Sequence, residues 1–394
     1  MGRDLKVLVI APFYEVFVKG LVDAMARHVE EVNVLVHHNY LSEISRLPLP
    51  VPSFSHVRRF TRRNLVNLTN TPENVRVHVE SLLYLVPDGR NRRLGGVLSR
   101  RYGKLIEERE IEFDIIHAHI EWPYGYAGLK LAEKFGKPLV VTSHSDVQTI
   151  ERNMKSPLRP AIEEVWRKAD AVIRVNRFDM ELIRRHNPHV YYIPNGYDPR
   201  RLQFMEKDAA REHLGIPLDK RLIFSFSYLY GRKGYQYLIE VMRAIVKEQP
   251  ETLCIIGGEG PMKKRLQRMV DDYGLEGHVK LIGFIPDEEL KYWMNAADIF
   301  VLPSLSEGNP TVMFEALGVG LPFIGTNIAG IPDIITSEEY GLLCPPADIE
   351  CLKEKILIGL RKRWNREKIR EYARRFTWDN IARETLQLYE RVIR

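Results

Sequence analysis

The chain has 394 residues, of which 45% are hydrophobic and 28% charged, a balance typical of a soluble globular protein with room for two domains. The net charge of +6 favours anionic partners without naming one. Cys254, Cys344 and Cys351 form no CxxC pair, so we expect no disulfide framework and a reducing compartment. No signal peptide and no run of about 18 apolar residues is visible, which predicts a cytoplasmic protein without a transmembrane helix.

Strands and helices alternate along the chain. The first half contains apolar runs typical of buried parallel strands at residues 6–10, 32–36, 113–119, 137–144 and 170–176. Amphipathic helices are predicted between them, for example at 18–29 and 126–135. Turn-forming residues interrupt the pattern at 194–217. Further strands are predicted at 221–227, 251–258, 279–283, 297–303 and 321–326, before a last amphipathic helix. The sequence therefore predicts an α/β protein with two doubly wound domains.

Several common chemistries lack their motifs. The loop after the first predicted strand has no glycine before Gly20, so a dinucleotide fingerprint is absent there. The stretch "GGEGPMKK" at 257–264 lacks the Gly-Lys-Ser/Thr ending of a phosphate-binding P-loop. No Asp-x-Asp pair or HExxH motif occurs, which argues against a carboxylate-bound Mg²⁺ or Mn²⁺ and against a zinc site of that type. We therefore expect neither a hydride-transferring enzyme nor a metal cofactor.

A basic loop and a helix start in the second domain form a better candidate site. Arg232 and Lys233 precede a predicted helix, and the free N–H groups of Thr311 and Val312 open another, with Asn309 as its expected N-cap. Cations and helix N-termini bind anions without a metal. Nearby, Glu307 and Glu315 lie in the apolar run "PSLSEGNPTVMFEALGVGLP".

Each of these charges has two interpretations. Lys233 is either a solvated lysine at a helix start or a phosphate ligand. Glu315 either faces water or a structural arginine, or it binds a ligand rich in hydroxyl groups, because a buried carboxylate needs hydrogen-bond donors. Together, the cations and carboxylates favour a nucleotide-sugar site over a glycosidase pair, since a nucleoside diphosphate leaves as a stable anion and needs no acid.

At these residues the sequence resembles the family 4 retaining glycosyltransferases, also called group 1, which have the GT-B fold. "EGNPTVMFE" resembles the family's Glu–seven residues–Glu signature, and matches to other family landmarks run along nearly the whole chain: "DIIHAHIEWPYG", "PLVVTSHSD", "ADAVIRVN", "IPNGYD", "RKG", "GGEGP" and "FTWDNIA". The resemblance implies a Rossmann-like acceptor domain at 1–197 and a nucleotide-sugar domain at 198–376, facing a cleft. It also implies that the tail helix at 377–394 packs back on the first domain.

The resemblance also assigns roles to residues. Glu315 would bind the donor ribose, and Glu307 would face the donor sugar beside the N–H groups of Gly308 and Asn309. Thr311, Val312 and Lys233 would hold the distal phosphate, helped by Arg232. Gly260 and Pro261 would shape the nucleotide pocket. His144 would approach the sugar from the first domain, whereas His117 and His119 are expected to be structural.

The sequence departs from the family pattern twice. Tyr228 stands where an arginine is usual, and the first loop lacks the frequent Gly-Gly turn. The predicted activity is metal-independent transfer of a hexose-type sugar, with retention, from a UDP-, GDP- or ADP-sugar to a glycan, lipid-linked or small acceptor. The alternatives are a sugar-nucleotide-binding protein without turnover and a GT-B phosphorylase or epimerase. No nucleic-acid partner is expected.

Basic residues in the first domain also suggest contact with an anionic membrane. They are Arg58, Arg59, Arg62, Arg63, Arg90, Arg92, Arg93, Arg100, Arg101 and Lys104. In the same region Leu94, Leu98, Tyr102, Leu105 and Ile106 are predicted to share one helical face, which would lie either on an anionic bilayer or on the sheet. The membrane interpretation places the protein on the inner face of the cell membrane.

Overall fold

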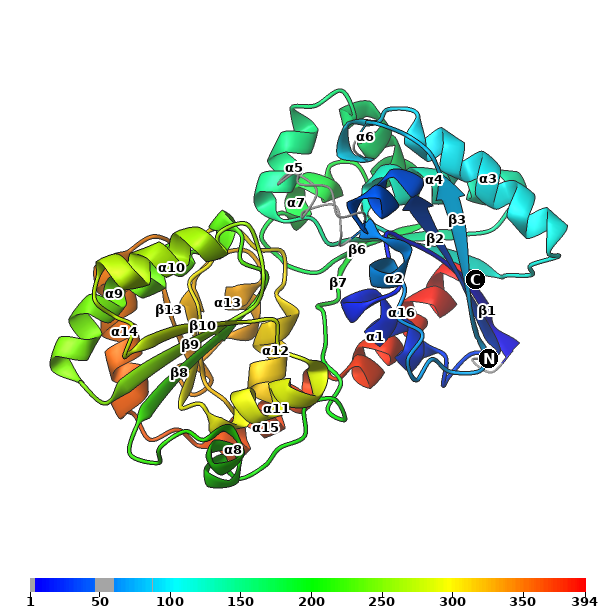
Figure 1. The fold of residues 1–394 in the computed structure, drawn as a ribbon. Helices are drawn as coiled ribbons and strands as arrows, with labels where there is room; N and C mark the ends of the chain where they lie inside the picture. Colours follow the sequence, from blue (N-terminus) through cyan, green and yellow to red (C-terminus); the bar gives the residue numbers. More distant parts are fainter. Residues whose placement is uncertain (1–3, 47–59, 87) are drawn as a thin grey trace. The chain divides into compact units, whose positions relative to one another are not determined.

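The computed structural model describes residues 4–46, 60–86 and 88–394, and Arg58 and Arg59 lie outside them. The chain forms two compact units (Figure 1). Unit 1 comprises Met1–Gly196 and Trp378–Arg394, and unit 2 comprises Tyr197–Thr377. Each unit is a parallel sheet with helices on both faces, so the predicted fold class is confirmed.

Among the described residues, the sheet of unit 1 has seven strands in the order β3-β2-β1-β4-β5-β6-β7. The strands are β1 (Lys6–Ala11), β2 (Glu31–Asn39), β3 (Val75–Leu82), β4 (Ile115–His119), β5 (Leu139–Ser143), β6 (Ala171–Arg174) and β7 (Val190–Tyr192). The helices are α1 (Val16–Met25), α2 (Arg62–Leu65), α3 (Leu94–Glu108), α4 (Tyr126–Phe135), α5 (Val147–Met154), α6 (Arg159–Lys168), α7 (Met180–Arg184) and α16 (Trp378–Ile393). Short helical turns are η2 (Tyr40–Arg46), η5 (Asp88–Arg90) and η6 (Glu121–Gly125).

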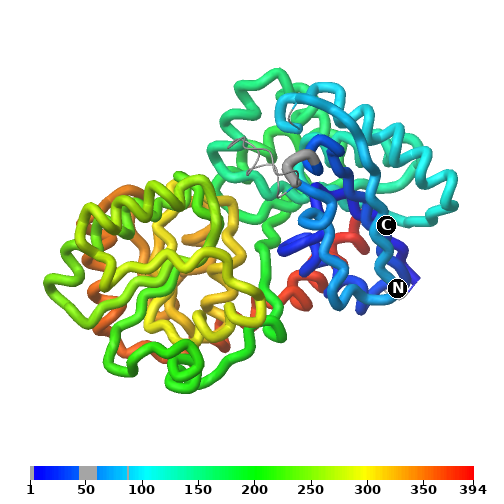
Figure 2. The backbone as a smooth tube through the Cα atoms, in the orientation of Figure 1, coloured from blue at the N-terminus to red at the C-terminus, as the bar shows by residue number. Residues whose placement is uncertain are grey.

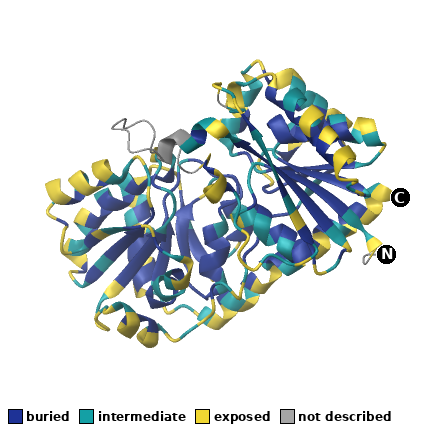
Figure 3. Ribbon diagram, turned by 45° about the vertical axis from the view of Figure 1, so that its right-hand side comes forward, coloured by how far each residue is buried: buried dark blue, intermediate teal, exposed yellow. Residues whose placement is uncertain are grey.

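The two faces of this sheet are built from alternate residues of the same strands. In β1, Val7 and Val9 belong to a core with α1 and α16, while Leu8 and Ile10 belong to a core with α3, α4 and α6. Successive strand side chains point to opposite faces, so a strand covered on both sides must be apolar throughout. Figure 3 shows the buried strands between helices that are exposed on their outer sides.

The last helix completes the core of unit 1, although about 180 residues of unit 2 separate it from the rest. Helix α16 packs beside α1, as Figures 1 and 2 show. A Cβ atom on Gly20 of α1 would overlap the indole of Trp378, so only glycine admits this contact. At the other end of α16, the hydroxyl of Tyr389 lies 2.5 Å from Nδ1 of His117 in β4.

Among the described residues, the sheet of unit 2 has six strands in the order β10-β9-β8-β11-β12-β13. The strands are β8 (Arg221–Phe226), β9 (Thr252–Gly257), β10 (Val279–Gly283), β11 (Ile299–Leu302), β12 (Phe323–Thr326) and β13 (Gly341–Cys344). The helices are α8 (Lys207–Leu214), α9 (Tyr235–Glu248), α10 (Lys263–Asp272), α11 (Asp287–Ala296), α12 (Thr311–Gly318), α13 (Ile331–Ile334), α14 (Ile349–Arg361) and α15 (Arg366–Ala373). Short helical turns are η7 (Gly231–Lys233) and η8 (Arg374–Phe376).

Both sheets reverse their strand order at one point. In unit 1 the reversal lies between β1 and β4, and in unit 2 between β8 and β11. The loops leaving such a pair of strands diverge to opposite faces, so a crevice opens at their carboxyl ends, where ligands of open α/β sheets bind. No helix in the described part of the chain is long and apolar enough to cross a membrane.

Candidate functional site

The candidate site of unit 2 lies at its strand-order reversal. Strand β8 is followed by the turn η7, which contains Arg232 and Lys233, and β11 is followed by the loop 303–310, which contains Glu307. Two hydrogen bonds join these loops. The amide of Leu305 donates to the carbonyl of Arg232 at 2.7 Å, and Nη1 of Arg232 donates to the carbonyl of Ser306 at 3.0 Å.

Gly234 makes this close approach of the two loops possible. It adopts a φ of 70°, a left-handed conformation that glycine tolerates best. A Cβ atom at this position would overlap the carbonyl oxygen of Pro303, the first residue after β11. The sequence "RKG" therefore combines two cations with the one residue that lets them lie against the neighbouring loop.

Lys233 and Glu307 form a buried ion pair across the reversal. The ammonium of Lys233 lies 2.5 Å from Oε1 of Glu307, and the residues are only 8% and 4% exposed. Ser304 donates to the same carboxylate oxygen at 2.6 Å, and Nη1 of Arg232 lies 3.5 Å from Oε2. The carboxylate of Glu307 thus holds the side chains of both Lys233 and Arg232.

Helix α12 begins directly after this loop. No side chain caps its first turn, and its N-cap position is occupied by Pro310. The first amides of a helix, here those of Thr311 and Val312, have no partner within the helix itself and point outward as donors. The expectation that Asn309 caps the helix is wrong, because its side-chain amide donates instead to the carbonyl of Gly330 at 3.4 Å. The amide of Gly330 also donates to the carbonyl of Gly308 at 3.1 Å. These two bonds join residues 308–309 of the loop to Gly330.

The glycine-rich loop after β9 lies beside the loop after β8. The amide of Leu229 donates to the carbonyl of Glu259 at 2.8 Å, and a Cβ atom on Gly260 would lie 2.6 Å from the carbonyl oxygen of Leu229. Pro261 follows on the surface. The loop thus packs against the backbone of the loop after β8 at Leu229. Tyr228, which replaces the arginine usual in the family, is half-buried with its ring 4.5 Å from that of Tyr230.

Glu315 has an arginine partner in this structure. Nη1 of Arg201 donates to its Oε1, while Nε and Nη2 of Arg201 donate to Asp287 at 3.0 and 2.7 Å. Burial alone would lower the pKa of Arg201, but the two carboxylates raise it above its ordinary value. Glu315 is 7% exposed, so the arginine supplies the compensating charge that a buried carboxylate needs. Arg201 is therefore the structural arginine that one of the two interpretations of Glu315 requires, and its hydrogen bond is to Oε1 of Glu315.

In unit 1, His144 directly follows β5, where the sequence placed it. The buried guanidinium of Arg174 fixes the backbone around it, donating to the carbonyls of Ser143 and Ser145 at 2.7 Å each. Asp179 neutralises this arginine with bonds of 2.5 and 2.8 Å. The imidazole ring of His144 packs on the ring of Phe17, with centroids 4.2 Å apart.

The altered first loop of the chain supports this histidine. Phe17 belongs to α1, whose first residue, Val16, has a φ of 42°. A β-branched residue rarely adopts this conformation, which glycine adopts freely. The position falls in the loop where the family often has a Gly-Gly turn, so this chain keeps a left-handed turn without glycine and places an aromatic ring against His144.

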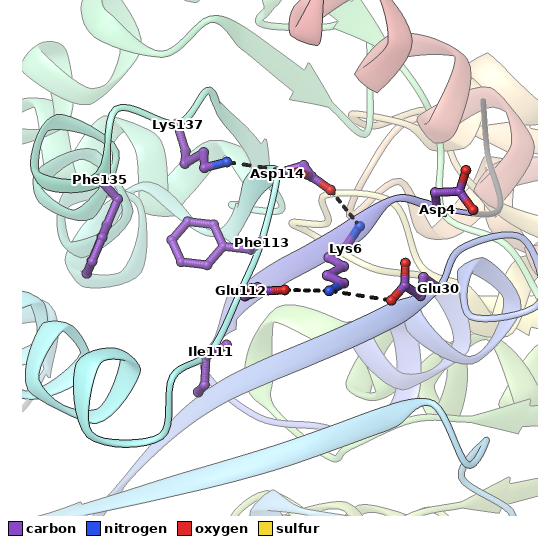
Figure 4. A pocket seen from close by; sticks show the side chains of 9 residues that line it. All are labelled: Asp4, Lys6, Glu30, Ile111, Glu112, Phe113, Asp114, Phe135 and Lys137. Atoms are coloured by element: carbon purple, nitrogen blue, oxygen red, sulfur yellow. Dashed lines mark hydrogen bonds and ion pairs between the residues drawn. The ribbon is translucent and has the colours of Figure 1, made fainter.

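One hollow of unit 1 lies away from these loops. Its volume is about 470 Å³, and Figure 4 shows its lining. The lining residues are Asp4, Lys6, Glu30, Ile111, Glu112, Phe113, Asp114, Phe135 and Lys137. They lie at or before the amino ends of β1, β4 and β5, opposite the strand ends that bind ligands. Ion pairs among them, such as Lys6 with Glu112 at 2.6 Å, satisfy the charges locally.

Helix α3 does not present the apolar face that the membrane interpretation needs. The residues of the predicted face are buried in the core of unit 1: Leu94, Leu98, Tyr102, Leu105 and Ile106. That interpretation of the face is wrong, because the apolar side packs on the sheet while Arg100, Arg101 and Lys104 point to solvent.

Sequence reasoning missed several residues that hold the site. Arg201 lies 114 positions before Glu315 in a turn-rich stretch, so no local spacing links the two. Ser304 looked like an ordinary loop residue, and its hydrogen bond to the side chain of Glu307 follows no recognised sequence motif. Arg174 lies inside an apolar strand pattern, and that exception to the pattern was the available signal. No cluster of metal-binding residues is found in the parts of the chain that the structure describes.

Two doubly wound units, with a basic loop and a carboxylate at the strand-order reversal of the second, are the arrangement expected of the GT-B fold. Comparison with known families agrees for both halves. Residues 14–201 match the family described as Glycosyltransferase Family 4, and residues 206–376 match Glycosyl transferases group 1. The chain belongs to these glycosyltransferases.

The individual relatives have low sequence identity to this chain. TuaC of Bacillus subtilis, whose name assigns it to teichuronic acid biosynthesis as a glycosyltransferase, is 32% identical over 64% of this chain and 63% of its own. The match thus spans less than two thirds of that protein. A sucrose-phosphate synthase from Thermosynechococcus elongatus has the same fold, with a TM-score of 0.75 and 20% identity over 98% of this chain and 99% of that one. HepE of Anabaena, crystallised with UDP-glucose, has a TM-score of 0.69 and 18% identity over 98% and 99%.

A double-mutant cycle tests the pairing of Arg201 with Glu315. We expect Arg201→Gln and Glu315→Gln to be strongly non-additive in free energy of unfolding, with a coupling of about 1.5–3 kcal/mol, because a charge-assisted bond to a buried carboxylate is lost in either variant. Urea unfolding of the four proteins measures it. The exposed pair Lys353–Glu350 on α14 is the control, with an expected coupling of at most about 0.5 kcal/mol. Additive effects of Arg201→Gln and Glu315→Gln would contradict the pairing.

Proposed function

We propose that this protein transfers a hexose-type sugar from a nucleoside-diphosphate sugar to a hydroxyl group of an acceptor. The observation that supports this most is the arrangement of Arg232, Lys233 and Glu307 beside the uncapped start of α12. The two cations and the helix amides suit the diphosphate, and the carboxylate suits sugar hydroxyls. The UDP-glucose complex of HepE supports such a donor, and the name of TuaC supports glycosyl transfer.

The same groups explain how the bond to the donor sugar would break. Charge accumulates on the leaving diphosphate in the transition state, and preorganised donors that face this charge lower the barrier. Lys233 has three N–H groups, of which Glu307 occupies one, so the ammonium can be held in place and still donate to a phosphate oxygen. We propose a retaining reaction, in which the acceptor attacks the face that the diphosphate leaves and a phosphate oxygen takes the acceptor's proton. No side chain is assigned as a general base.

The remaining site residues take supporting roles in this proposal. Gly260 and Pro261 line the nucleotide pocket, and Gly308 and Asn309 shape the loop next to the sugar. Glu315 receives a ribose hydroxyl at the carboxylate that Arg201 holds. His144 contributes a contact to the sugar from unit 1.

Replacing Lys233 tests the diphosphate site. We expect Lys233→Ala to weaken UDP, GDP or ADP binding by about 1.5–3 kcal/mol, roughly ten- to 150-fold, and to change nucleoside binding little. Calorimetry with the base selected in a thermal-shift screen of the three diphosphates measures it. Since Lys233→Ala leaves Glu307 buried without its cation, the double variant Lys233→Met/Glu307→Gln separates folding from binding: it restores stability but not affinity. Lys353→Ala serves as the control, and unchanged diphosphate affinity in Lys233→Ala would refute the assignment.

Chelation tests the absence of a metal from the reaction. If Lys233, Arg232 and the amides of α12 neutralise the diphosphate, transfer and donor hydrolysis should proceed at the same rate in EDTA. The rate of nucleoside diphosphate release from purified protein is the measurement, and a known Mn²⁺-dependent enzyme verifies that chelation is complete. Activity lost in EDTA and restored by Mg²⁺ or Mn²⁺ would overturn the proposal that the reaction needs no metal. A protein that binds the donor but never releases diphosphate would be the non-catalytic alternative.

Membrane contact remains a proposal, now with a different surface. Leu83, Leu85 and Val86, which follow β3, are 71%, 87% and 47% exposed. Arg90, Arg92 and Arg93 follow residues 87–89 and are also exposed. We call these six residues the β3 rim. Exposed apolar side chains beside cations suit an anionic bilayer, where each cation contributes about 1 kcal/mol. This surface would bring the enzyme to a lipid-linked acceptor at the inner face of the cell membrane.

Vesicle sedimentation tests the β3 rim. We expect binding to phosphatidylglycerol-containing vesicles that weakens with salt, and a loss of most of it in Arg90→Gln/Arg92→Gln/Arg93→Gln, because three attractive charges are removed. The charge-matched control, Arg361→Gln/Lys362→Gln/Arg363→Gln in unit 2, should bind like the wild type. Equal losses in both triple variants would indicate a general charge effect, and no binding at low salt would favour a soluble acceptor.

A further inference from the structure

Three histidines at the carboxyl ends of β4 and β5 form a connected series that the proposed reaction uses only at one end. Nδ1 of His119 lies 2.9 Å from Nε2 of His144. The ring of His119 also stacks on that of His117, with centroids 4.4 Å apart. His117 is bonded at both nitrogens, to Thr142 at 2.6 Å and to Tyr389 at 2.5 Å. The series therefore runs from the loop after β5 to helix α16.

All three imidazoles are neutral at physiological pH. Burial lowers the pKa of His119 to about 3. Burial also lowers the pKa of His144 well below its ordinary value, with His119 and Arg174 adding to the effect. The pKa of His117 is lowered in the same way. A neutral imidazole has one N–H group and one nitrogen lone pair, so a hydrogen bond between two of them fixes both tautomers at once.

Two arrangements of the bond between His119 and His144 are possible. If His144 donates from Nε2, its Nδ1 is a bare lone pair and the proton of His119 must be on Nε2. If His119 donates from Nδ1, the proton of His144 must be on Nδ1 and Nε2 of His119 is the lone pair. Nδ1 of His144 and Nε2 of His119 are both buried without a partner among the described residues. The choice therefore decides which of the two carries an unpaired N–H group.

The surroundings favour the second arrangement. His119 is 1% exposed, and an N–H group without an acceptor in such a place is costlier than a lone pair. His144 is partly exposed and lines a hollow of about 20 Å³, enough for one water, together with Phe17 and Asn195. The ring of His144 therefore borders a space that admits one water or ligand oxygen, whereas His119 does not line this hollow.

We propose that His119 is a positioning residue that fixes His144 as the Nδ1–H tautomer, so that His144 offers a hydrogen-bond donor to an oxygen of the bound sugar and not a base. The contact with the sugar rests on the proposed function; the tautomer does not. Arg174 fixes the backbone of His144 and Phe17 its ring, so His119 completes the set by fixing its proton. This agrees with a reaction in which the diphosphate takes the acceptor's proton.

Nitrogen NMR of the full chain with ¹⁵N-labelled histidine tests the tautomer without any substrate. We expect the His144 ring, assigned by the loss of its signals in His144→Gln, to show a protonated Nδ1 and an unprotonated Nε2. His119→Asn keeps an N–H donor near the position of Nδ1 and should preserve this pattern. His119→Phe removes the donor and should shift His144 towards the Nε2–H form. The exposed His189→Phe is the control and should change nothing. An Nε2–H tautomer in the wild type, or no change in His119→Phe, would overturn the proposal.

Kinetics of the same variants test the link to the reaction. We expect His119→Phe to lower kcat/KM by about tenfold or more, as the loss of one hydrogen bond to a reacting sugar would, while His119→Asn retains most of it. Unfolding midpoints verify that both variants fold. A tautomer shift in His119→Phe with unchanged kcat/KM would overturn the role in transfer. Absence of transferase activity in the wild type would instead refute the proposed function and leave the NMR result standing.

Discussion

The ion pair between Lys233 and Glu307 is the interaction on which the site of unit 2 depends. Both charges are buried, and removing two ions from water costs several kcal/mol each unless their geometry and additional hydrogen bonds offset it. Ser304 supplies such a bond, and the contact exists only because Gly234 lets the loops after β8 and β11 touch. The ammonium of Lys233 would therefore already be desolvated and oriented when an anion binds beside it. Electrostatic catalysis needs this preorganisation.

The fold could be predicted from the sequence where strands form continuous apolar runs. β1, β2, β4, β5 and β6 in unit 1 and β8 to β12 in unit 2 all appear at the expected apolar runs. The strands that were missed, β3, β7 and β13, are edge strands. β3 alternates polar and apolar residues, because one face is less covered, and β7 has only three residues. The search for continuous apolar runs could not find β3 and β7, whereas β13, with the run "GLLC", was overlooked although it is as long as β11 and β12.

The sequence predicted which loops form the candidate site, but it did not predict which side chains in those loops pair with each other. The sequence brought Lys233 and Glu307 to neighbouring loops, because both follow strands at one edge. It assigned them to separate parts of a ligand, whereas the structure pairs them with each other. Glu315 shows the same limit, since its partner Arg201 lies in a stretch without periodicity and is positioned only by tertiary packing. Long-range ion pairs leave no signature in local spacing.

The replacement of an arginine by Tyr228 shifts charge within this site. With a tyrosine there, the cations of this loop are Arg232 and Lys233. The carbonyl of Ser306 and the carboxylate of Glu307 hold the guanidinium of Arg232 close to Glu307. A guanidinium held in this way can donate to a phosphate with its remaining N–H groups, because Arg232 has five donors. The loss of one cation from the family pattern therefore makes the position of Arg232 more important, and Glu307 becomes the residue that orients both remaining cations as well as a candidate ligand of the sugar.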